Sequence, residues 1–287
     1  MMGLRYAYFP GCVAKGSARE VEDAMRAVVK ALDIELVDMP GAACCGAGVM
    51  KQANHRLQLT LNARTFAQAE AMGLDVLTPC ATCQGNMYED LALLLDDEKL
   101  RAEVNDVLEK TCGVRFEGNL RMRHLLQVLV EDVGLDAVRD HVVNPVDFPV
   151  AGYYGVPMLQ EGASGDDDPM DPHYFEDLLV AIGSSPVDYD GATRSVGFPG
   201  LLGRERTAML QTAEVLSEAK QEGALVMATA CPLSHFNLDV YQVKAKKVSG
   251  RDTALPVVHL PELLAFALGM MPDRYAQLRT RALVMGA

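Results

Sequence analysis

The chain has 287 residues, of which 26 are Lys or Arg and 39 are Asp or Glu, so its formal net charge is −13. This negative charge argues against binding to nucleic acids or anionic membranes, and an apolar share of 49% argues against intrinsic disorder. The apolar stretches fall short of the ~20 residues that a membrane-spanning helix needs, and the amino terminus shows no secretory signal pattern. We therefore expect a cytoplasmic protein without a membrane span.

The amino-terminal part of the chain predicts strands that alternate with helices. The expected order is a strand over 4–9, a helix over 17–32, a strand over 35–37, a helix over 54–72 and a strand over 75–78. Pro10 and Gly11 end the first strand, and Gly73 ends the second helix. This alternation favours a parallel sheet with helices packed against it.

The chain is internally duplicated. Residues 76–86 align with 227–237 at a constant offset of 151, which pairs Cys80 with Cys231 and Cys83 with Ser234. Residues 121–133 predict a helix, and the two prolines within 141–149 favour a boundary after it. The predicted fold is α/β, with two pseudo-symmetric repeats over 1–146 and 147–287, each a small, mostly parallel sheet flanked by helices.

Five of the seven cysteines lie in the first repeat at positions that predict a common site. Each follows a predicted strand or begins a predicted helix, and such positions converge at one edge of a parallel sheet. These cysteines are Cys12, Cys44, Cys45, Cys80 and Cys83. In a cytosolic protein, thiolates that converge favour a soft metal over disulfides. The alternative is a set of reduced thiols in the hydrophobic core.

The number of cysteines favours an iron-sulfur site over zinc. A structural zinc ion takes four ligands, so a fifth cysteine would be surplus, whereas an iron-sulfur cluster offers several irons. Gly46 and Gly48 allow the tight turn that would aim both Cys44 and Cys45 at one object. Zinc bound by a subset of the cysteines remains the alternative.

Three motifs give a specific resemblance. Phe-Pro-Gly-Cys12, Ala-Cys-Cys-Gly-Ala47 and Pro-Cys-Ala-Thr-Cys83 resemble the CCG (cysteine-rich) domain family, which includes the B-type subunit of heterodisulfide reductase. The resemblance covers nearly the whole chain. It implies that a complete repeat holds a noncubane [4Fe-4S] cluster with all five cysteines as ligands. In the family's archetype, two such clusters face each other and split a disulfide between them.

The second repeat departs from this family pattern. The positions of its five cysteines are occupied here by Val156, Phe198, Pro199, Cys231 and Ser234, so one cysteine of five remains. We therefore expect a single cluster and a remodelled second pocket. This pattern is similar to the heterodisulfide reductase-like complexes of sulfur oxidisers. Related domains also occur in fumarate and succinate enzymes of the E type, in lactate utilisation proteins and in glycolate oxidase.

The expected function is an iron-sulfur oxidoreductase subunit that passes electrons between a sulfur-containing substrate and partner subunits. The resemblance implies a C-type iron-sulfur subunit and an A-type flavoprotein subunit as partners, and a lipoate-carrier protein or a small thiol as substrate. No flavin is expected in this chain, because no Gly-x-Gly-x-x-Gly follows a predicted strand. The alternatives are a subunit that only relays electrons and a scaffold stabilised by zinc.

Three further residues need an interpretation. Cys231 is a candidate catalytic thiol, because the start of a helix lowers the pKa of a cysteine; it is otherwise a remnant cluster ligand or a core residue. Cys112, at a predicted helix end, is expected to be structural. His259 follows a strand-like stretch near the sheet edge and is expected to cap a helix, with a place beside the site as the alternative. The other histidines show no ligand spacing.

Overall fold

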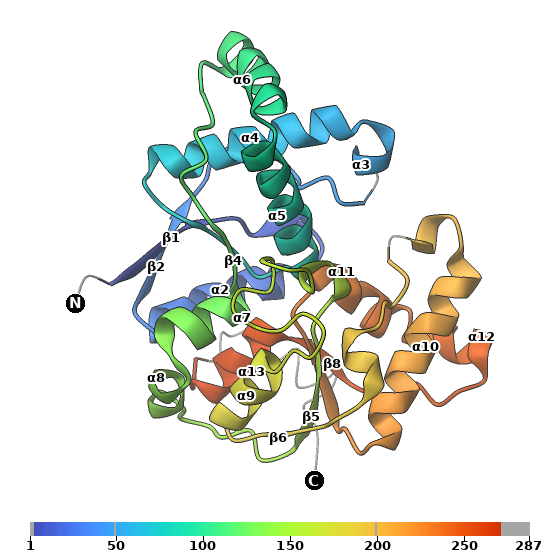
Figure 1. Ribbon diagram of the computed structural model, residues 1–287. Helices are drawn as coiled ribbons and strands as arrows, with labels where there is room; N and C mark the ends of the chain where they lie inside the picture. Colours follow the sequence, from blue (N-terminus) through green and yellow to red (C-terminus); the bar gives the residue numbers. More distant parts are fainter. Residues whose placement is uncertain (1–2, 49, 199, 271–287) are drawn as a thin grey trace.

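Two four-stranded sheets, in which all strands are parallel, form the centre of the molecule (Figure 1). The computed structural model describes residues 3–48, 50–198 and 200–270. The first sheet has the order β2-β1-β3-β4 and the second has the order β6-β5-β7-β8. The strands are β1 (Leu4–Tyr8), β2 (Ile34–Asp38), β3 (Val76–Thr78), β4 (Met122–His124), β5 (Pro149–Tyr153), β6 (Ser185–Pro186), β7 (Val226–Thr229) and β8 (Val257–His259).

The helices of the first half connect its parallel strands and cover its sheet. They are α1 (Gly11–Lys15), α2 (Arg19–Ala31), α3 (Met50–Ala53), α4 (His55–Ala71), α5 (Ala81–Asp96), α6 (Glu98–Cys112), α7 (Leu125–Gln127), the π-helical turn η1 (Val128–Val133) and α8 (Leu135–Asp140). In α2, Val21, Met25 and Val28 are buried at helical spacing. Asn54 and Asp97 cap α4 and α6, because their side chains accept hydrogen bonds from the first turn of each helix.

The second half repeats this arrangement of strands and helical segments. Its helical segments are η2 (Val156–Met158), α9 (Tyr174–Ala181), η3 (Asp190–Thr193), η4 (Gly200–Leu202), α10 (Glu205–Gln221), α11 (Pro232–His235), the π-helical turn η5 (Phe236–Val240), α12 (Gln242–Ser249) and α13 (Leu260–Ala267). Corresponding strands occupy corresponding places in the two sheets, with β1 and β5 each paired to two neighbours. The prediction of an α/β fold with two pseudo-symmetric repeats is confirmed.

The two halves share one hydrophobic core. Helix α13 of the second half packs against α2 of the first, and α7 packs against α9, so helices of each half cover the other (Figure 1). Met25 and Leu264 lie in the same buried cluster. At a second contact, α5 lies against η2, where a Cβ atom on Gly85 would come within 1.7 Å of the Pro157 carbonyl oxygen. The repeats therefore hold a fixed relative position.

One predicted element is wrong. The helix expected over 121–133 begins with a strand, because Met122–His124 pairs in parallel with Val76–Thr78 as the edge strand β4. All three residues of β4 are buried. Met122 is the only apolar residue of the three, so local periodicity does not favour a strand here, and the edge of β3 supplies the hydrogen bonds that decide for it. The helical part starts only at Leu125.

Candidate metal centre

Five of the six cysteines of the first repeat, all except Cys112, come from three loops at one sheet edge. Cys12 lies in α1 after β1, and Cys44 and Cys45 lie in the loop after β2. Cys80 is the N-cap residue of α5 after β3, and Cys83 lies in the first turn of that helix. Since these strands are parallel neighbours, their carboxyl ends deliver all five side chains to the same place.

A cavity of about 280 Å³ lies between these loops. Its walls include all five cysteines and apolar side chains from both repeats. The lining residues are Pro10, Gly11, Cys12, Val13, Cys44, Cys45, Gly46, Ala47, Gly48, Met50, Cys80, Cys83, Phe198, Pro232 and Leu233. Cys45, Cys80 and Cys83 are buried, whereas Cys12 and Cys44 are exposed. A second hollow of about 310 Å³ shares these two exposed cysteines and includes Lys15.

Backbone N–H groups point at the sulfur atoms. The Gly46 N–H donates to Cys44 Sγ over 3.5 Å, and the Cys83 N–H donates to Cys80 Sγ over 3.4 Å. Another N–H, from Ala47, donates to the sulfur of Cys45. Gly46 has a φ of +80°, the left-handed conformation that glycine adopts readily. These donors stabilise negative charge on the sulfurs, as a set of metal-bound thiolates requires.

Hydrogen bonds between the thiols split their acidities. The thiol of Cys12 lowers the pKa of Cys44, and hydrogen bonds from Cys231 and Cys83 lower that of Cys80. The hydrogen bond to Cys44 is the largest cause that raises the pKa of Cys12 and of Cys45. The hydrogen bond to Cys45 is the largest cause that raises the pKa of Cys83. All five cannot ionise together without a cation, because like charges at this spacing disfavour each other. This arrangement of several thiols fits a metal centre that is bound by thiolate sulfur atoms.

A buried amide network supports the Cys45 loop. The Cys45 carbonyl accepts hydrogen bonds from Gln58 Nε2 at 3.1 Å, Asn62 Nδ2 at 3.1 Å and Asn86 Nδ2 at 2.7 Å. Gln58 and Asn62 also donate to Asp90 Oδ2. Sequence reasoning missed this network. The signal in the sequence was two pairs of polar residues, each pair four positions apart on the buried face of one helix. The pairs are Gln58 and Asn62 in α4, and Asn86 and Asp90 in α5.

Asp90 links this network to the surface. Its side chain is fully buried, and its Oδ1 lies 3.5 Å from Nε2 of His55, whose side chain is 45% exposed. Burial raises the pKa of Asp90 from 3.8 to about 6. The carboxyl group therefore changes its protonation near pH 6, two hydrogen bonds away from the Cys45 carbonyl.

The second repeat forms one wall of the cysteine cavity. Phe198, at a position where the resemblance implies a cysteine in the family, lines that cavity beside Cys12 and Cys44. Val156 is exposed at the start of η2, and Ser234 is buried in α11. Pro199 lies outside the described residues. The remaining position, Cys231, is fully buried at the N-cap of α11.

Cys231 touches the first repeat without lining the cavity of about 280 Å³. Its Sγ lies 3.0 Å from Thr82 Oγ1, and it interacts with Cys80. Burial raises the pKa of Cys231 well above its usual value. Its role as a reactive thiol stays a prediction. Cys112 is exposed at the end of α6, and His259 is the N-cap residue of α13.

Sequence comparisons identify the family. A family model described as "Cysteine-rich domain", CCG, matches residues 6–88. The chain is 32% identical over 271 residues to the 8-methylmenaquinol:fumarate reductase membrane anchor subunit of Wolinella succinogenes, and the match covers 94% of each protein. The chain belongs to the CCG domain family. This CCG chain is also 29% identical over 275 residues to the B-type subunit of a CoB-CoM heterodisulfide reductase from Methanosarcina acetivorans, a match that covers 94% of this chain and 91% of the relative.

A solved structure shares the fold. A hypothetical protein from Helicobacter pylori superimposes with a TM-score of 0.75 over 97% of the CCG chain, at 17% sequence identity. The chain spans about half the length of that protein, since the match covers 51% of it. Among the described residues of this CCG chain, no helix combines the length and the apolar character needed to cross a bilayer.

Proposed function

We propose that the chain is the iron-sulfur redox subunit of a heterodisulfide reductase-like complex, and that it transfers electrons between a sulfur-containing substrate and partner subunits. The substrate class is a thiol, a disulfide or a sulfane compound. The observation that carries this proposal is the lining of one cavity by five thiols, with backbone N–H groups directed at three of them. The Methanosarcina acetivorans relative, which is named as a heterodisulfide reductase subunit, supports it.

The cofactor in this proposal is one [4Fe-4S] cluster of the noncubane type. Cys12, Cys44, Cys45, Cys80 and Cys83 would hold it, and it would supply electron transfer and an iron atom that binds substrate sulfur. A second such cluster has no counterpart set of thiols, because the second repeat keeps only Cys231 of its five positions. The chain itself binds no flavin in this proposal.

The walls of the cavity give the chain's own residues distinct tasks. Val13, Met50, Phe198 and Leu233 are apolar and keep water away from the buried sulfurs. Substrate approaches from the side of the exposed Cys12 and Cys44, which line the second hollow. Lys15 lies in that hollow and would attract a substrate with negative charge.

The partners in this proposal are a C-like iron-sulfur subunit and an A-like flavoprotein subunit, in the cytoplasm. The relatives from Wolinella succinogenes and Methanosarcina acetivorans are both named as subunits of reductases, which supports membership in a complex. A lipoate-carrier protein or a small thiol would supply the sulfur substrate. Two alternatives stand beside this proposal. Electron relay without a substrate fits a second repeat that keeps one cysteine of five positions, and a scaffold stabilised by zinc fits a site that is redox-silent.

Anaerobic purification tests the proposal. We expect a brown protein with four irons and four acid-labile sulfides per chain, whose electron paramagnetic resonance spectrum changes when a thiol or disulfide is added without partner subunits. Zinc bound by the cysteines, without iron or labile sulfide, would support the scaffold and overturn the redox function. An iron-sulfur signal that responds to a reductant but to no sulfur compound would support the relay.

A further inference from the structure

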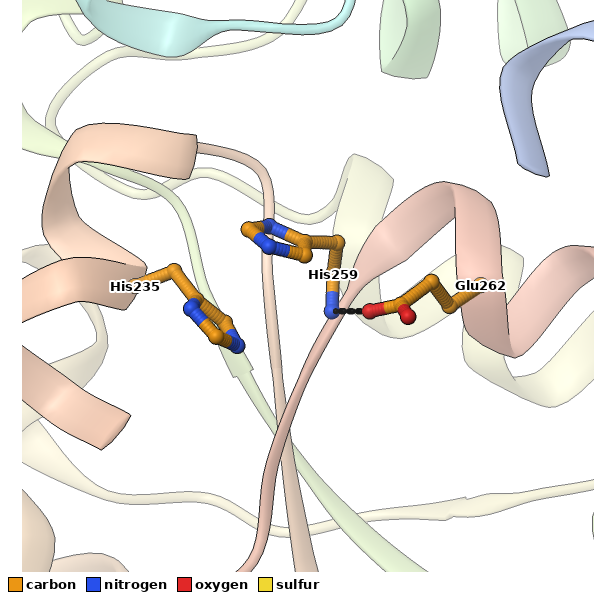
Figure 2. Close-up of side chains that lie close together, drawn as sticks. All are labelled: His235, His259 and Glu262. Atoms are coloured by element: carbon orange, nitrogen blue, oxygen red, sulfur yellow. Dashed lines mark hydrogen bonds between the residues drawn. The ribbon is translucent and has the colours of Figure 1, made fainter. Parts of the chain in front are cut away.

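A second group of potential metal ligands lies in the second repeat. His235 of α11, His259 at the end of β8 and Glu262 of α13 each offer one ligand atom, and these atoms lie within 4.8 Å of one another (Figure 2). The three residues are 8%, 1% and 2% exposed, respectively. His259 and Glu262 are neighbours at the start of α13, whereas His235 comes from α11, so the fold brings His235 to the other two.

The first repeat has the same backbone frame with different side chains. His124 is the last residue of β4, and His259 is the last residue of β8. Each pairs with the threonine that ends the neighbouring strand, His124 with Thr78 of β3 and His259 with Thr229 of β7. The His124 N–H donates to Gln127 Oε1 at 2.8 Å, and the His259 N–H donates to Glu262 Oε2 at 2.9 Å (Figure 2). The neutral amide of the first repeat is thus a carboxylate in the second.

The third position shows the same kind of replacement. Gln84 Nε2 donates to the Met122 carbonyl at 3.1 Å, and His235 Nε2 lies 3.2 Å from the carbonyl of Val257, the equivalent residue of β8. An amide has again become a side chain that binds transition metals. Two of three positions differ between the repeats, and both differences supply a metal ligand.

The hydrogen bonds of the two end-of-strand histidines also differ. In the first repeat, His124 Nδ1 accepts from the Leu126 N–H at 3.1 Å, and Nε2 lies 3.0 Å from the Ala230 carbonyl. In the second repeat, neither ring nitrogen of the buried His259 has a hydrogen-bond partner among the described residues. Leaving a buried polar group unpaired destabilises the folded protein. An ion bound to one of them would offset part of this destabilisation.

His235 is already oriented for coordination. Because the Val257 carbonyl can only accept, Nε2 of the neutral His235 ring carries the proton and Nδ1 keeps the lone pair. Histidine ligands of metals commonly donate their other N–H to a backbone carbonyl in this way. The carbonyl contact therefore selects the tautomer that a metal needs.

We propose that His235, His259 and Glu262 bind a divalent transition-metal ion, Zn²⁺ in the first place. Two imidazoles and one carboxylate suit Zn²⁺, with water in the fourth position. The two rings are stacked, with centroids 3.7 Å apart and planes 22° from parallel. The lone pair of an imidazole nitrogen lies in the plane of its ring, so two stacked rings do not direct their lone pairs at one ion. Binding thus requires the His259 ring to turn, which breaks no ring hydrogen bond.

Metal analysis of the full chain tests this proposal. The purified protein is exposed to Zn²⁺, freed of excess metal, and measured by mass spectrometry of its metals and by zinc X-ray absorption. We expect one zinc per chain with nitrogen and oxygen ligands. The double variant His235→Gln with Glu262→Gln recreates the neutral side chains of the first repeat and is expected to lose this zinc while it keeps its iron.

The double variant Cys44→Ser with Cys83→Ser is the matched control, expected to lose iron and to keep zinc with nitrogen and oxygen ligands. Two results would overturn the proposal. One is wild-type zinc that is absent or bound only by sulfur, a result that needs no variant to fold. The other is a glutamine variant that retains as much nitrogen- and oxygen-bound zinc as the wild type.

Discussion

The Sγ atoms of Cys12 and Cys44 lie 3.7 Å apart, although the residues are 32 positions apart in the chain. Their neighbouring strands β1 and β2 pair in parallel from Leu4 and Ile34 onward, so both strands end at the same edge. Cys80 and Cys83 arrive at this edge after β3, the other neighbour of β1. The parallel sheet is therefore what assembles the thiols.

Replacing a single thiol tests the ligand set. We expect Cys44→Ser or Cys83→Ser to lose most of the iron and to unfold at lower temperature, because the binding of a metal group contributes to folding free energy. Iron content and thermal unfolding of the anaerobic protein measure this. Cys112→Ser, at an exposed thiol of α6, is the control and keeps its iron. Full iron retention in either ligand variant would contradict the assignment.

Replacing Cys231 tests whether this thiol is a remnant cluster ligand or a buried residue beside the site. We expect Cys231→Ser to leave the iron content unchanged, because this thiol is absent from the lining of the cavity formed by the other cysteines. The serine hydroxyl can keep the contact that Sγ makes with Thr82 Oγ1. Iron and labile sulfide per chain are the measurements. A clear drop in iron would assign Cys231 to the ligand set.

Asp90 predicts a pH-dependent stability. The pKa of Asp90 is about 6 in the folded protein and 3.8 in the unfolded chain. Between these two pH values, Asp90 is protonated in the folded protein and ionised in the unfolded chain, so stability falls as pH rises. The stabilisation is complete below pH 3.8 and is lost as pH rises through about 6. The shift of roughly two pKa units corresponds to about 3 kcal/mol. We expect the wild type to lose this amount relative to Asp90→Asn between about pH 4 and pH 7, measured by urea unfolding. Parallel pH profiles would contradict the prediction.

Gly85 tests the contact between the repeats. We expect Gly85→Ala to destabilise the protein by about 3 kcal/mol, because the new methyl group would overlap the Pro157 carbonyl oxygen. The free energy of unfolding in urea measures the effect. The control is Gly203→Ala, where a Cβ meets nothing within 4 Å and a change within about 0.5 kcal/mol is expected. Equal stability of the two variants would mean that α5 and η2 separate at little cost.

The sequence alone determined the main strands and helices over residues 4–78 and the cysteine-bearing loops between them. Strand and helix periods predicted β1, α2, β2, α4 and β3 within a few residues of their observed bounds. Local periodicity carries this information, because one buried face repeats every 2 or every 3.6 residues. The boundary placed at residue 146, and the ligand role of the five cysteines, stay predictions.

Tertiary structure decided what depends on neighbours distant in sequence. The strand at Met122–His124 forms because β3 offers a free edge, and no local pattern records that edge. The amides that bind the Cys45 carbonyl come from α4 and α5, and His235 meets His259 only because α11 and β8 pack together. Such contacts arise from packing between elements, whereas sequence periods report only which face of each element is buried.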